Sequence, residues 1–135
     1  MSNILIVDDD KLVREATQIM LRSRGYSVAV AADGEAAVAA ARTSQFDLAI
    51  VDLFMPGMDG LQVIKTIRQL CPDMLLIAAS GFMFRESCPQ MPEFDAMAIE
   101  AGAVATLYKP LRPIEVIAAV EAALSAASYR RSSVA

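Results

Sequence analysis

The chain has 135 residues, of which 56% are hydrophobic and 21% are charged, a composition that fits one folded domain with its own core and argues against disorder. A net charge of −4 argues against a nucleic-acid groove or an anionic membrane surface as partner. The absence of histidine excludes histidine-based catalysis, histidine metal ligation and a role as phosphohistidine donor. The N-terminal apolar run is too short and too acidic at its end for a signal peptide, and no stretch approaches the roughly 18 apolar residues of a membrane helix, so we expect a soluble, cytoplasmic protein.

The first half of the chain alternates between strand-like and helix-like segments. Ile4–Val7 is apolar at every residue, which indicates a strand that is buried on both faces. Lys11–Arg24 is expected to be a helix that Asp10 caps, with Val13, Ala16 and Met20 on one face. The segments that follow are, in order, a strand over Ser27–Ala32, a helix over Glu35–Arg42 and a strand over Leu48–Leu53.

The second half continues the alternation with one interruption. Apolar residues at helical spacing predict a helix over Leu61–Leu70, which ends before Pro72 because the residue that precedes a proline avoids the helical region. The segment Gly81–Asp95 has no clean period, and we interpret it as a long loop. The remaining elements are strands over Met74–Ala79 and Ala105–Tyr108, a short helix near Phe94–Ala101 and a last helix that begins at Pro113.

Five units of strand followed by helix predict a parallel sheet with helices on both faces, an α/β doubly wound fold. We expect residues 1–127 to form this single domain and residues 128–135 to form a short polar tail. Sheets of this kind place their sites at the carboxyl ends of the strands, near the point where the strand order reverses.

Polar residues stand at the carboxyl ends of four of the five predicted strands. Asp8 and Asp9 follow the first strand, Asp52 the third, Ser80 the fourth and Lys109 the fifth. Each pair of close carboxylates repels by about 4 kcal/mol at an effective dielectric constant of about 20. A hard divalent cation removes that cost, and Mg²⁺ prefers oxygen ligands of this kind. The sequence therefore predicts a magnesium site at this edge of the sheet.

A carboxylate beside such a metal can attack phosphorus and become an aspartyl phosphate. The transferring group carries negative charge, which cations and hydrogen-bond donors must stabilise. We expect Mg²⁺, the Lys109 amine and the Ser80 hydroxyl to supply that stabilisation around Asp52.

Each of these residues also has a structural interpretation. Asp8, Asp9 and Asp10 could simply end a strand and cap a helix, and for Asp10 we favour that role alone. Asp52 could be a turn residue, although an unpaired charge directly after a core strand would be costly. Lys109 could be an ordinary solvated lysine.

The motifs ILIVDDD, VDLFMPGMDG, AAS and YKP, in this order and spacing, resemble the receiver domain of bacterial two-component response regulators over about residues 3 to 125. The resemblance implies a flavodoxin-like five-stranded parallel sheet, in the strand order 2-1-3-4-5, with five helices. It also implies a sensor histidine kinase or a phosphotransfer protein as phosphodonor and a downstream protein as target. A homodimer is compatible with it, and direct binding of nucleic acid is not expected.

Carried over by motif, the resemblance implies that Asp52 is the phosphoacceptor. Asp9 would be the principal acidic ligand of Mg²⁺ with Asp8 beside it, and the main-chain carbonyl of Phe54 would be a further ligand. Ser80 and Lys109 would bind the phosphoryl group, and the Lys109-Pro110 bond would be cis.

Three departures from the family pattern stand out. Thr106 occupies the position where the family usually has an aromatic switch residue, and Tyr108 is the nearest aromatic on the same face of the strand. The Gly81–Asp95 loop is longer than expected, which predicts a specialised partner surface or a lid. Phe54 and Phe82 stand where polar side chains often position water, so we expect slow hydrolysis of the phosphoryl aspartate.

Other functions fit less well. A flavin or nucleotide binder should have Gly, Ser or Thr after the first strand rather than three carboxylates. A phosphatase with an aspartate nucleophile generally has a second carboxylate two residues on, where this chain has Phe54. The serious alternative is a receiver-like interaction module that phosphorylation does not control. We predict a phosphorylation-dependent signalling switch, not an enzyme with a substrate of its own.

Overall fold

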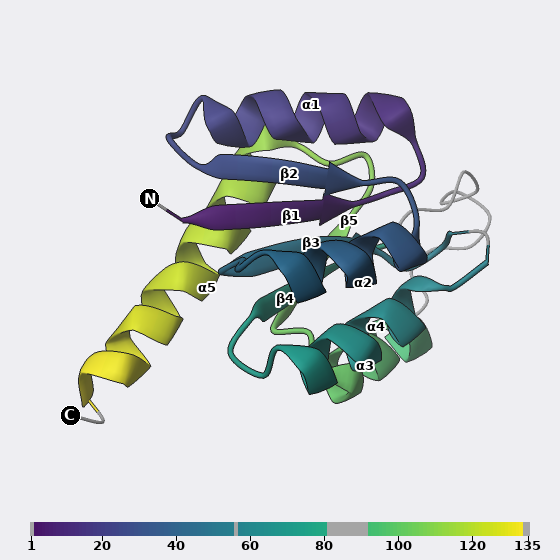
Figure 1. The fold of residues 1–135 in the computed structure, drawn as a ribbon. Coiled ribbons are helices and arrows are strands. Elements are labelled where there is room, and N and C mark those ends of the chain that lie inside the picture. The colour runs from purple at the N-terminus through teal and green to yellow at the C-terminus, as the bar shows by residue number, and fades with distance from the viewer. Residues whose placement is uncertain (1, 56, 81–91, 134–135) are drawn as a thin grey trace.

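The computed structural model describes residues 2–55, 57–80 and 92–133, and within them one sheet of five parallel strands has the order β2-β1-β3-β4-β5 (Figure 1). The strands are β1 (Asn3–Val7), β2 (Ser27–Ala31), β3 (Leu48–Asp52), β4 (Leu75–Ser80) and β5 (Ala105–Tyr108). The helices are α1 (Lys11–Arg22), α2 (Gly34–Thr43), α3 (Gly60–Leu70), α4 (Pro92–Ala101) and α5 (Pro113–Ser133). The predicted flavodoxin-like fold with five helices is confirmed.

Helices cover both faces of the sheet, so the central strands are apolar on both sides. Alternate residues of β1 enter different cores: Ile4 and Ile6 pack with α1 and α5, whereas Leu5 and Val7 pack with α2, α3 and α4 (Figure 1). This two-sided burial explains the unbroken apolar run at the start of the sequence. It also leaves the strand ends as the place where polar side chains can gather.

Aspartates cap three of the helices. Asp10, Asp33 and Asp59 each accept a hydrogen bond from a main-chain amide in the first turn of α1, α2 and α3. The expected capping role of Asp10 is confirmed, since its carboxylate accepts from the Leu12 amide at 2.9 Å. These carboxylates satisfy amides that the helix itself leaves without partners.

Two details of the helices differ from expectation. Ala16 is exposed, and the buried residues of α1 are Thr17 and Leu21, so the core-facing side is rotated from the one that the apolar spacing indicated. Helix α5 runs on to Ser133, through most of the segment expected to be a polar tail. The division into a domain and a tail stays a prediction. None of the described helices is long and apolar enough to cross a membrane.

Candidate metal and phosphoacceptor site

The parallel register brings the carboxyl ends of β1, β3, β4 and β5 to one edge of the sheet. Asp52 is the last residue of β3 and Ser80 the last residue of β4, while Asp8 and Lys109 directly follow β1 and β5. Asp8, Asp52 and Ser80 are buried, whereas Asp9 is exposed. The predicted convergence of these segments is therefore present, although the roles of the individual residues stay predictions.

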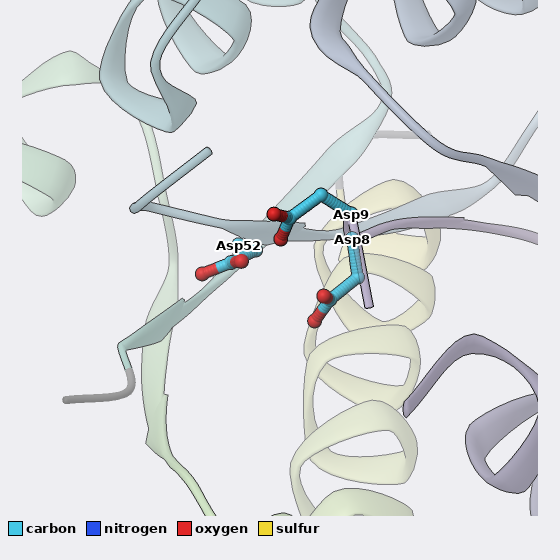
Figure 2. Close-up of side chains that lie close together, drawn as sticks. All are labelled: Asp8, Asp9 and Asp52. Atoms are coloured by element: carbon cyan, nitrogen blue, oxygen red, sulfur yellow. The ribbon is translucent and has the colours of Figure 1, made fainter. Parts of the chain in front are cut away.

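Three carboxylates form the centre of this edge. Asp8, Asp9 and Asp52 each offer an oxygen, and these oxygens all lie within 4.8 Å of one another. Figure 2 shows the two adjacent aspartates and Asp52 gathered at the strand ends. A cluster of carboxylate oxygens is the donor set that suits a hard cation such as Mg²⁺, so the residues fit the ion that the sequence predicts.

Lys109 lies against two of these carboxylates. Its Nζ is 2.6 Å from Asp8 Oδ2 and 3.4 Å from Asp52 Oδ2. Burial alone would lower the pKa of Lys109, but the hydrogen bond to Asp8 and the charges of both acids outweigh burial and raise it. The amine is therefore a fixed cation at the point where the two buried acids meet. The Lys109-Pro110 bond is cis, as predicted.

Asp52 is an unusual acid because its environment opposes its charge. Burial raises the pKa of Asp52 to about 6, and the nearby Asp8 adds to the rise. Lys109 and the Phe54 amide, which donates to Asp52 Oδ1 at 3.1 Å, lower the pKa and so limit the shift. A carboxylate that is ionised near neutral pH but poorly solvated is a suitable nucleophile.

Helix α3 begins directly behind Asp52. A Cβ atom added to Gly60 would lie 2.1 Å from the Asp52 carbonyl oxygen and 2.5 Å from Leu53 Cα. Only glycine permits this approach of the helix to the strand end. The glycine that follows Asp59 in the sequence is thus a packing requirement of the site rather than part of its chemistry.

The predicted switch residues lie on β4 and β5. Ser80 pairs in register with Tyr108, and the Lys109 amide donates to the Ser80 carbonyl at 2.9 Å. Leu107 packs with α5, so alternation turns Thr106 and Tyr108 to the face that α4 covers. There the Tyr108 hydroxyl donates a hydrogen bond to Asp95 Oδ2 on α4.

Part of the predicted loop lies outside the described residues. Residues 81–91 lie outside the described residues, so the Gly81–Asp95 loop and Phe82 stay predictions, and α4 occupies the end of that segment from Pro92 onward. Phe54 is half-buried beside the site, and the role of its carbonyl as a metal ligand stays a prediction.

Two contacts at this edge involve residues that the sequence reasoning did not single out. Asp95 binds Tyr108, and Arg14 donates through Nη1 to the Asp8 carbonyl at 2.8 Å. The signal for Arg14 was present, since a cation stands one helical turn after the three aspartates. Asp95 had none, because its partner is 13 residues away on a strand.

Comparison with known protein families gives a match over residues 4–121 to the response regulator receiver domain. The DNA-binding response regulator MtrA of Mycolicibacterium paratuberculosis is 35% identical over 122 residues, which are 90% of this chain and 50% of MtrA. The alkaline phosphatase synthesis transcriptional regulatory protein PhoP of Bacillus subtilis is 36% identical over 136 residues, 98% of this chain and 50% of PhoP. The chain thus spans about half the length of these relatives.

Solved structures resemble the whole domain. A CheY-like response regulator receiver domain protein from Methanospirillum hungatei superposes with a TM-score of 0.87 at 28% identity, covering 96% of this chain and 98% of that one. A protein assigned to the response regulators, from Chloroflexus aurantiacus, gives a TM-score of 0.82 at 32% identity, covering 92% of this chain and 98% of that one.

Proposed function

The chain belongs to the response regulator receiver domain family, and we propose that it accepts one phosphoryl group on Asp52 from a sensor histidine kinase or a phosphotransfer protein. Members of this family are phosphoacceptor signalling domains. The observation that supports Asp52 is its position: it is a buried carboxylate at the sheet edge, 3.4 Å from the Lys109 amine and within 4.8 Å of two further carboxylates.

In the proposed reaction an Asp52 carboxylate oxygen attacks the phosphorus atom of a phosphohistidine. A new P–O bond forms as the P–N bond breaks, and the imidazole leaves with the electron pair. The Lys109 ammonium and the Ser80 hydroxyl would stabilise the oxygens of the transferred group. Water later hydrolyses the acyl phosphate. We expect this hydrolysis to be slow, because Phe54 stands beside Asp52 where a polar side chain would position the water.

The acidic cluster would hold Mg²⁺ through Asp9 and Asp52, with Asp8 beside them and the Phe54 carbonyl as a further ligand. When bound, the ion supplies positive charge to the phosphoryl oxygens. Lys109 already holds the carboxylate of Asp8 at 2.6 Å, which favours Asp9 over Asp8 as the directly ligating residue.

We further propose that Ser80, Thr106 and Tyr108 transmit the phosphorylation state. Tyr108 pairs with Ser80, precedes Lys109 and holds Asp95 on α4, so it joins the site to a helix that a partner can contact. Of the side chains of α4 that the structure describes, only Ala98 is buried, whereas Met97 and Ile99 are exposed. Thr106 lies on the same strand face, but it is too small to replace the aromatic switch side chain that the family usually has at its position, so we assign that role to Tyr108.

The downstream partner is a protein, and a homodimer is compatible with the exposed residues of α4. DNA binding is stated for MtrA, a protein about twice as long as the matched region, and is not proposed for this chain. The comparisons give no support to the alternative of an interaction module without phosphorylation. The acids, the lysine and the serine are also all present at the edge of the sheet.

The test is incubation with Mg²⁺ and an acyl phosphate, followed by measurement of the intact mass. We expect a gain of one phosphoryl group in the wild-type protein and in Asp73→Asn, an exposed control. No gain is expected for Asp52→Asn or after chelation of the metal. Equal phosphorylation of Asp52→Asn would show that another residue is the acceptor, and no gain in the wild-type protein would favour the interaction module.

A further inference from the structure

Arg14 makes a contact at the site that lies outside the proposed chemistry. It is half-buried in the first turns of α1, and its Nη1 donates to the main-chain carbonyl of Asp8 at 2.8 Å. The Arg14 amide meanwhile donates to the Asp10 carbonyl at 3.0 Å, which is the ordinary helical bond. The side chain therefore ties the first turns of α1 back to the corner between β1 and the helix.

The carbonyl that Arg14 holds belongs to the peptide unit that joins Asp8 to Asp9. This unit is planar and rigid, so fixing the Asp8 carbonyl fixes the direction in which the chain enters Asp9. Every other polar group of Asp8 is also engaged: the amide donates to Ala31 at 3.1 Å, Oδ1 accepts from the Asp10 amide at 2.9 Å, and Oδ2 accepts from Lys109.

Asp9 differs from Asp8 because its side chain is exposed, yet it has an oxygen within 4.8 Å of oxygens of both Asp8 and Asp52. Its placement must come from the main chain that carries it. Among the described residues, Arg14 is the one whose charged side chain forms a hydrogen bond with that peptide unit. An arginine suits this task, because its planar group stays charged and its donors have a fixed geometry.

We propose that Arg14 is a positioning residue of the metal pocket, which holds the Asp8–Asp9 peptide so that the Asp9 carboxylate faces Asp52. Its positive charge also offsets part of the repulsion among the carboxylates. The inference rests on the proposed function, because that function supplies the role of Mg²⁺. It adds a residue of α1 to a site otherwise built at the strand ends.

The same helix offers a matched control. Arg22 Nη2 donates to the Val28 carbonyl at 3.3 Å, so it too joins α1 to a main-chain carbonyl six residues away, but it lies at the opposite end of the helix. Arg14→Met and Arg22→Met each remove one such bond and keep an unbranched apolar stem. Arg14→Lys keeps the charge but replaces the planar guanidinium by a compact ammonium group.

The experiment measures Mg²⁺ affinity by titration calorimetry and the unfolding temperature in EDTA for each variant. Loss of a residue that orients a metal ligand typically weakens binding by about 10- to 100-fold, and we expect about tenfold for Arg14→Met. Arg22→Met should bind Mg²⁺ like the wild-type protein, even where its unfolding temperature falls as far as that of Arg14→Met. Arg14→Lys should recover part of the affinity.

Equal Mg²⁺ affinity in Arg14→Met and the wild-type protein would overturn the inference. So would a loss that Arg22→Met reproduces, because the effect would then follow general stability. If Arg14→Met does not fold, Arg14→Gln decides, because it removes the charge and the guanidinium while keeping a polar side chain. Unchanged affinity in that variant together with a lowered unfolding temperature would show a structural role only. A wild-type protein that binds no Mg²⁺ would refute the proposed function itself, and the inference with it.

Discussion

Replacing Asp52 by Asn should stabilise the metal-free protein near neutral pH, by an amount that disappears in acid. Asparagine has nearly the same shape and keeps an oxygen that can accept from the Phe54 amide, which lies 3.1 Å from Asp52 Oδ1. The substitution therefore removes a buried charge with little change in packing. What it tests is whether the environment of Asp52 opposes ionisation as strongly as its pKa indicates.

The size of the effect follows from the shift in the pKa of Asp52. Burial raises that pKa from 3.8 to about 6, and a shift of this size corresponds to about 3 kcal/mol. Between these values the folded state binds more protons than the unfolded state, so the free energy of unfolding falls as the pH rises. The stabilising contribution is fully present below about pH 4 and is lost above about pH 6. Roughly 2 kcal/mol of the difference falls between about pH 4.5 and pH 7.5.

The assay is urea unfolding of the wild-type protein and of Asp52→Asn in EDTA across that pH range. The free-energy difference between them should grow with pH in favour of the variant. Saturating Mg²⁺ should then stabilise the wild-type protein, because binding favours the folded state, and should stabilise the variant much less. A difference that stays flat across the pH range would refute the reasoning, because it would mean that Asp52 is not held in an environment that resists its charge.

Two further substitutions test the surroundings of Asp52. Phe54→Asn should shorten the half-life of the phosphoryl aspartate, measured by intact mass over time, because a polar side chain can position water; an unchanged half-life together with rapid hydrolysis in the wild-type protein would contradict the proposed obstruction. Tyr108→Phe should cost about 1–3 kcal/mol in urea unfolding, because it leaves the half-buried Asp95 carboxylate without its donor, while phosphorylation of Asp52 persists. An unchanged stability would show that the Tyr108–Asp95 bond is weak in solution.

Much of the site could be predicted because strand order and parallel direction decide where segment ends meet. The apolar runs before Asp8, Asp52 and Lys109 identify buried strands, and a doubly wound sheet brings their carboxyl ends to one edge. Composition alone excluded histidine chemistry. The residue types then limited what the edge could bind, since close carboxylates without a cation repel.

The features that escaped prediction depend on contacts between elements. Apolar spacing placed Ala16 on the buried side of α1, but Thr17 packs there, because the angle at which a helix meets the sheet is decided by packing and not by periodicity. The Tyr108–Asp95 contact joins residues whose separation in the sequence carries no pattern. Arg14 stands one helical turn after the three aspartates, but that spacing does not show that its side chain reaches the Asp8 carbonyl, which only the fold reveals.

Under the proposed function, the buried charge of Asp52 that weakens this fold would also make it responsive to phosphorylation. Lys109 shares its single charge between Asp8 and Asp52, so the edge carries more negative than positive charge when no ion or phosphoryl group is present. A useful switch needs a few kcal/mol of differential stabilisation between its two states, and the cost of burying Asp52 is of that size. Converting the Asp52 carboxylate into an acyl phosphate changes what Lys109 must neutralise, and Lys109 follows directly on Tyr108 and its bond to α4. The unfavourable placement of Asp52 is thus the property on which the proposed phosphorylation would act.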